Sequence, residues 1–113
     1  MSIILGIDPG TTTVGFALIE KNGRQVSILN YGVITTAPKI AIPLKLLDIT
    51  KDLEDLIDIY RPTVCGIEKL FFFNNQKTGI DVAQARGAIL LTLQRKGLLI
   101  HEFTPLQVKR GIS

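Results

Sequence analysis

The first third of the chain shows apolar runs and alternations that are typical of short β-strands. Residues 3–7 form an apolar, branched-rich run that stops at an Asp-Pro-Gly turn, and a second apolar run covers residues 14–19. Asn22 and Gly23 follow it as a strong two-residue hairpin signal. Residues 26–34 then alternate between apolar and polar positions. The pattern predicts three consecutive strands joined as an antiparallel meander.

A helical period follows the meander. Pro43 stands where the first turn of a helix tolerates proline, and apolar residues recur every three or four positions up to Tyr60. Charged residues fill the positions between them, and Pro62 ends the pattern. The sequence therefore predicts one amphipathic helix with a single apolar face. A short apolar strand is expected next at residues 64–67, and Glu68 closes it.

The last part of the chain repeats this alternation of helix and strand. A second helix is predicted at about residues 77–96 and a fifth strand at residues 98–103, and Thr104 followed by Pro105 has the form of another helix start. A meander followed by helix–strand units predicts an α/β fold, in which helices pack on a mixed five-stranded sheet of antiparallel and parallel strands. A right-handed crossover places the strand that ends at Glu68 beside the first strand.

Composition supports a folded core and excludes several classes of protein. The chain has 113 residues, of which 46% are hydrophobic, and its formal net charge is +3, so disorder is not expected. No apolar stretch approaches the ~20 residues of a membrane-spanning helix, and no secretion leader is recognisable. Cys65 is the one cysteine and has no partner for an internal disulfide. We expect a single cytoplasmic domain over residues 1–113, with no membrane partner.

Charge is distributed unevenly along the chain. Residues 1–56 carry a net charge of −1, whereas residues 57–113 carry +4. A basic half favours a polyanionic partner such as nucleic acid, although a mildly basic solvated surface explains the same numbers.

Two carboxylates, Asp8 and Glu68, each close a strand that is expected to be buried. Ligands of open α/β sheets bind at the carboxyl ends of the strands, where these side chains would meet. Mg²⁺ would relieve the repulsion between them, and it favours one or two carboxylates together with phosphate oxygens. This combination suits phosphodiester hydrolysis. The simpler alternatives are a turn-forming role for Asp8 and an ion pair of Glu68 with Lys69 or Arg86.

An aromatic loop is predicted directly after the second carboxylate. Phe71 begins a run of three phenylalanines that leads into Asn75. An exposed aromatic ring beside a catalytic carboxylate can stack on an unpaired base. The alternative is that one or two of these rings pack under the second helix.

The second helix is apolar on more than one side. One stripe would cover the sheet, and it consists of Val82, Ala85, Ile89 and Leu93. The other stripe is rich in small residues that admit a close partner helix, and it consists of Gly79, Ala83, Gly87 and Leu90. The second stripe predicts a homodimer contact, unless the helix is buried on two sides within one chain. Arg86 of the same helix is expected to reach towards the carboxylates or the nucleic acid.

Several of these residues occur in an order that resembles one family, the RuvC Holliday-junction resolvases. The resemblance covers essentially the whole chain, and its most specific part is Ile67-Glu68, then Phe71, then Gln-Ala-Arg-Gly at residues 84–87. The opening Gly-Ile-Asp-Pro-Gly at residues 6–10 is shared with other superfamilies. Asn75, Thr104-Pro105 and Gln-Val-Lys at residues 107–109 also match the family's order.

The resemblance implies a ribonuclease H-like fold and a structure-selective endonuclease that cuts four-way DNA junctions as a homodimer in recombination and repair. It implies Mg²⁺ as cofactor, with Mn²⁺ as a substitute, and a metal-activated water that attacks the phosphodiester. Asp8 matches the first acidic ligand of the family and Glu68 the second. Phe71 matches the aromatic residue that stacks on an opened base, and Lys109 matches a basic residue near the phosphates. A branch-migration helicase complex is the partner that the resemblance suggests.

The chain departs from the family at its end. The third and fourth acidic residues of the family lie on a later helix, and no Asp or Glu follows Glu102. The sequence is therefore expected to be a C-terminally truncated form, either a fragment or a natural short relative, and to be inactive as it stands. The alternatives are a junction-binding relative without catalysis, a YqgF-like RNA-processing nuclease and a fragment of an actin-like ATPase.

Overall fold

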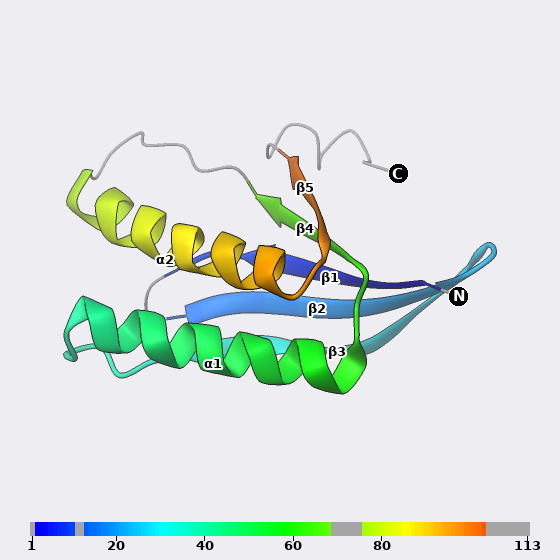
Figure 1. Cartoon of the computed structure of the whole chain (residues 1–113), viewed down its shortest axis with the longest axis horizontal. Coiled ribbons are helices and arrows are strands. Elements are labelled where there is room, and N and C mark those ends of the chain that lie inside the picture. The colour runs from blue at the N-terminus through cyan, green and yellow to red at the C-terminus, as the bar shows by residue number, and fades with distance from the viewer. Residues whose placement is uncertain (1, 11–12, 69–75, 104–113) are drawn as a thin grey trace.

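The structure is a computed structural model that describes residues 2–10, 13–68 and 76–103. Three strands come first, and helices then alternate with strands (Figure 1). The elements are β1 (Ser2–Asp8), β2 (Thr13–Asn22), β3 (Gln25–Thr35), α1 (Ile42–Tyr60), β4 (Val64–Glu68), α2 (Gln76–Arg95) and β5 (Leu99–Phe103). This order confirms the predicted one. The helix start predicted at Thr104 and Pro105 lies outside the described residues.

The strands form one five-stranded sheet in the order β3-β2-β1-β4-β5. The strands β1, β2 and β3 are antiparallel neighbours, whereas β4 is parallel to both β1 and β5. The register pairs Leu5 with Cys65 and Ile7 with Ile67 across β1 and β4. The mixed sheet and the position of β4 beside β1 are therefore as predicted.

Both helices cover the same face of the sheet (Figure 1). They pack against each other as well as on the strands. The core between helices and sheet is continuous and apolar, and its fully enclosed members include Leu5, Leu18, Ile49, Leu53, Cys65, Ile67, Ala85, Ile89 and Leu93. Burial of this kind is the main stabilising contribution to the fold. No helix in the described part of the chain is long and apolar enough to cross a membrane.

The first helix ends at Tyr60, directly before Arg61 and Pro62. Arg61 adopts a left-handed conformation with φ 53°, and its N–H donates to the carbonyl of Ile57 at 2.7 Å. Pro62 follows and has no N–H with which to continue the helix. The chain then turns into β4, and the N–H of Thr63 donates to the carbonyl of Ile3. This short connection aligns β4 beside β1.

The second face of the sheet has no described element over it. Its residues alternate with the core residues along each strand, and in β3 they are Val26, Ile28, Tyr31 and Val33, all exposed. The step of three between Ile28 and Tyr31 is explained by a bulge: Leu18 pairs with Asn30 and Ile19 with Ile28, which leaves Leu29 as an extra residue. The apolar alternation of β3 thus marks the open face, while Ile34 and Asn30 face the helices.

Candidate metal and nucleic-acid site

Asp8 and Glu68 lie at the carboxyl ends of neighbouring parallel strands. The last pair in the register of β1 and β4 joins Ile7 to Ile67, so the two carboxylates stand one position further along, on the open face. Adjacent strands lie about 4.8 Å apart. Both side chains line one hollow of about 460 Å³ in this face. The structure therefore brings together the two residues that the sequence predicts to act jointly.

The floor of this hollow is made of small residues. Gly6, Gly15 and Ala17 line it, with Tyr31 and Phe103 at its two sides. A Cβ atom added at residue 15 would lie 3.5 Å from the Cβ atom of Asp8, in ordinary contact. Glycine in a strand commonly marks a place where another chain or a ligand approaches the backbone closely. The hollow is thus open to a large ligand directly beside the carboxylates.

Neither carboxylate has a cationic partner among the described residues. Asp8 is exposed and Glu68 is half-buried. The alternative in which Arg86 pairs with the carboxylate of Glu68 is not what the structure shows, because Arg86 contacts only the main-chain carbonyl of that residue. The other proposed partner, Lys69, lies outside the described residues. Within the described part of the chain, neither carboxylate is thus neutralised by a cation.

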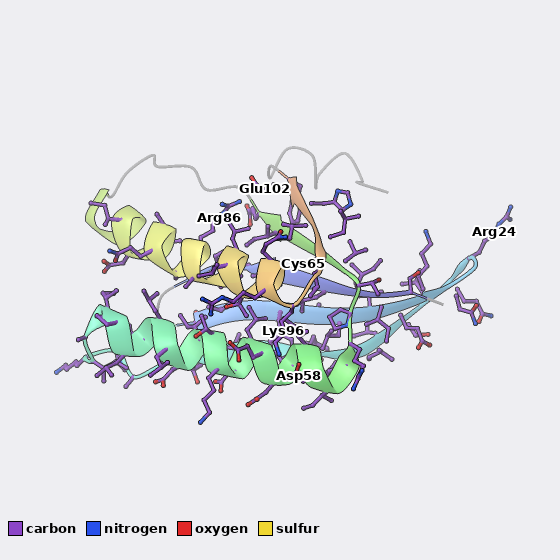
Figure 2. All side chains as sticks on the ribbon, in the orientation of Figure 1. Arg24, Asp58, Cys65, Arg86, Lys96 and Glu102 are labelled. Atoms are coloured by element: carbon purple, nitrogen blue, oxygen red, sulfur yellow. The ribbon has the colours of Figure 1, made fainter. Side chains whose placement is uncertain are left out.

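Arg86 instead joins α2 to the ends of two strands. Its Nε donates to the carbonyl oxygen of Glu68 at 3.3 Å, and its Nη2 lies 3.1 Å from Oε2 of Glu102 on β5. Figure 2 shows Arg86 and Glu102 close together along the upper side of the view, away from Asp58 and Lys96 in its lower part. The Arg86 side chain is only 14% exposed. Its predicted contact with nucleic acid stays a prediction, and its observed contacts position the strand end that carries Glu68.

The two carboxylates form a partial metal site. In the described ranges, no group of three or more Asp, Glu, His or Cys side chains lies close enough together to hold a metal ion. Mg²⁺ nevertheless binds through one or two carboxylates together with waters and phosphate oxygens. Asp8 and Glu68 have the chemistry that such an ion requires, so the residues present fit it.

The two stripes predicted on α2 have different surroundings. Ala85, Ile89 and Leu93 are fully buried against the sheet, and Val82 beside them is half-buried. In the small-residue stripe, Gly87 is exposed, and Gly79, Ala83 and Leu90 are half-buried. A Cβ atom added at residue 87 would meet nothing within 4 Å. The stripe is thus accessible, and its role as a dimer contact stays a prediction.

Three predicted nucleic-acid contacts, Phe71, Asn75 and Lys109, lie outside the described residues. The sequence reasoning in turn missed Glu102 and Phe103 of β5, which lie beside the site. Glu102 faces the helices and meets Arg86, while Phe103 faces the hollow. The sequence could have revealed both positions, because neighbouring side chains of a strand point to opposite faces of a sheet.

Comparison of the sequence with known proteins identifies one family. The family "Crossover junction endodeoxyribonuclease RuvC" matches residues 4–113. The protein of that name from Halothermothrix orenii is 46% identical over 111 residues, which are 98% of this chain and 67% of the relative. The one from Petrotoga mobilis is 42% identical over 98% of this chain and 68% of the relative.

A solved structure shows the same fold. T. thermophilus RuvC, in complex with a Holliday junction substrate, superposes with a TM-score of 0.88 at 25% identity, over 96% of this chain and 69% of that one. The likeness and the sheet order confirm the predicted ribonuclease H-like α/β fold. The chain spans about two thirds of the length of the relatives it matches. It belongs to the RuvC family of crossover junction endodeoxyribonucleases.

Proposed function

We propose that this chain binds four-way DNA junctions and holds a divalent cation at Asp8 and Glu68, as the nuclease part of a Holliday-junction resolvase. The observation that carries the proposal is the meeting of these two carboxylates in one open hollow at the ends of β1 and β4. The family match supports the junction as substrate, because the matched relatives have the name of enzymes that cut it. The same match favours a resolvase over the YqgF-like and actin-like alternatives.

The proposed cofactor is Mg²⁺, with Mn²⁺ as a substitute. When bound, such an ion supplies the Lewis-acid stabilisation that phosphodiester hydrolysis needs. Asp8 and Glu68 would hold it, and their negative charge also excludes the DNA backbone from the hollow until a cation is present. The small residues Gly6 and Gly15 leave the space in which a phosphate group approaches the carboxylates.

The other residues of the site orient it. Arg86 neutralises Glu102. By donating to the Glu68 carbonyl, it also holds the end of β4 against α2. We propose that Phe71 stacks on an opened base, and that Asn75 and Lys109 contact the junction, because the resemblance assigns them these roles. A homodimer through the small-residue stripe of α2 suits a four-way junction, since two-fold symmetry would present one site to each of two strands.

We expect the 113-residue chain to bind junctions without cutting them at a useful rate. Two carboxylates bind Mg²⁺ weakly, through waters, and two-metal hydrolysis needs ions fixed about 3.5–4 Å apart. A longer form that supplies further acidic ligands is expected to cut, and Asp8→Asn or Glu68→Gln is expected to abolish cutting in that form.

The test compares a four-way junction with a linear duplex of the same sequence, by fluorescence anisotropy, with and without Mg²⁺. We expect the wild-type chain to prefer the junction, with an affinity that Mg²⁺ increases and that salt decreases. Asp8→Asn and Glu68→Gln should remove the effect of Mg²⁺, whereas Asp58→Asn, a matched change on α1, should not. Equal affinity for both DNAs would contradict the junction proposal, and an unchanged Mg²⁺ effect in both site variants would contradict the metal site.

A further inference from the structure

The free edge of the sheet at β3 is a long strand without the usual protection. No described element pairs with the outer edge of this strand. Its 11 residues, QVSILNYGVIT, include no proline and no charged side chain. Edge strands are commonly blocked by charges, prolines or short length, because they otherwise pair with another chain. The opposite edge, β5, has only 5 residues and carries His101 and Glu102.

The open face beside this edge is apolar. Four side chains of β3 point to it, with exposed fractions of 62% for Val26, 66% for Ile28, 74% for Tyr31 and 58% for Val33. A strand added at this edge would place every second side chain next to this row. Those positions of an added strand would favour apolar residues. Tyr31 also borders the hollow that contains Asp8.

The helix side of the same edge is acidic. A groove of about 290 Å³ runs between β3 and α1, and Asp52, Asp55 and Ile59 line it from the helix. Residues 33–35 line it from the end of the strand, where the side chain of Ile34 is the one that faces the helices, and no Lys or Arg is among its described lining residues. The helix-side side chains of an added strand would point into this groove where the strand runs beside residues 33–35. Those positions would favour Lys or Arg.

We propose that β3 is a docking edge for an extended segment of a partner protein in which apolar residues alternate with Lys or Arg. Main-chain hydrogen bonds to β3 would supply affinity, and the two kinds of side chain would supply specificity. A second copy of this chain fits less well. Its own β3 has no cation to offer to Asp52 or Asp55, and pairing would bring the acidic groups of two copies together. The proposal does not depend on the nuclease function.

The test uses the full 113-residue chain and a short capped peptide in which Lys alternates with Val. Binding is followed by fluorescence anisotropy, and its place is read from the backbone amide signals in ¹H–¹⁵N NMR spectra. We expect saturable binding, with the largest shifts in β3. A peptide of the same composition, with all Lys before all Val, should bind more weakly.

Matched variants and peptides distinguish pairing of the peptide with β3 from unspecific attraction of a cationic peptide to the acidic helix. Asp52→Asn and Asp55→Asn should each weaken binding about threefold, the size expected of an exposed ion pair. Asp58→Asn removes one charge on the other flank of α1, beside Lys96, and should leave binding unchanged. Two peptides methylated on alternate amide nitrogens should differ, because only the set that faces β3 donates to it.

Several results would overturn the proposal. These are no saturable binding, equal binding of both methylated peptides, equal loss in all three Asp variants, or NMR shifts outside β3 and α1. Analytical ultracentrifugation provides a further test. A dimer that pairs through β3 and excludes the peptide would show that a second copy of the chain, not a partner segment, occupies this edge.

Discussion

The guanidinium of Arg86 lies 3.1 Å from the carboxylate of Glu102 while it also donates to the main-chain carbonyl of Glu68. One side chain of α2 is thus joined to the ends of both β4 and β5. The carbonyl belongs to a residue whose own carboxylate faces the opposite side of the sheet, towards the hollow. The position of a site residue is therefore set from the core side of the sheet.

The first prediction concerns this connection. Arg86→Ala should lower the free energy of unfolding by about 1–2 kcal/mol, because it removes charge-assisted contacts of a largely buried side chain. Glu102→Gln should have a smaller effect, since the carboxylate is 41% exposed. Urea denaturation measures both. Lys96→Ala breaks the exposed pair with Asp58 and serves as the control. A larger loss in this control than in Arg86→Ala would contradict the assignment.

The second prediction concerns the floor of the hollow. Gly6→Ala should leave the fold intact or stabilise it by about 0.5 kcal/mol, because the nearest atom to the new methyl group is the carbonyl oxygen of Ala17 at 3.9 Å. The methyl group would occupy the space beside Asp8, so junction binding should weaken. Thermal unfolding and anisotropy measure the two effects. Unchanged junction affinity in a folded variant would show that DNA does not enter the hollow.

The third prediction concerns α2. Gly87→Ala should raise the free energy of unfolding of the isolated chain by about 0.5–1 kcal/mol, because glycine weakens a helix interior and the new methyl group meets nothing. Gly87→Arg should keep the fold but prevent close approach of a second helix. Light scattering then reports the oligomeric state. A wild-type chain that is monomeric at micromolar concentration, or an Arg variant that still dimerises, would place the interface elsewhere.

The fourth prediction concerns pH. Burial raises the pKa of the Cys65 thiol from 9.0 to about 12. The unfolded chain loses this proton near pH 9 and the folded chain does not, so stability is complete below pH 9 and falls as the pH rises towards 12. Between pH 8 and 10 the wild type should lose about 1.4 kcal/mol more than Cys65→Ala. Parallel urea titrations measure the difference. Identical pH dependence in the two proteins would mean that the thiol ionises freely.

The sequence contained enough information for the order of elements and for the pair of carboxylates. Strand ends that point to one edge of a sheet bring Asp8 and Glu68 together whatever the details of packing. The alternation in β3 predicted a strand, but a period of two does not show which face a helix will cover. The pairing of Arg86 with Glu102 depends on how α2 lies on the sheet. No local sequence pattern contains that information.

The central claim is that Asp8 and Glu68 together hold the divalent cation. Paramagnetic broadening by Mn²⁺ in ¹H–¹⁵N spectra of the full chain tests it most directly, because the effect falls steeply with distance from the ion. The account predicts selective loss of the amide signals of Asp8, Gly15 and Glu68, and their recovery in Asp8→Asn and in Glu68→Gln. Broadening centred on the acidic flank of α1 at Asp52 and Asp55, or broadening that neither substitution changes, would contradict it.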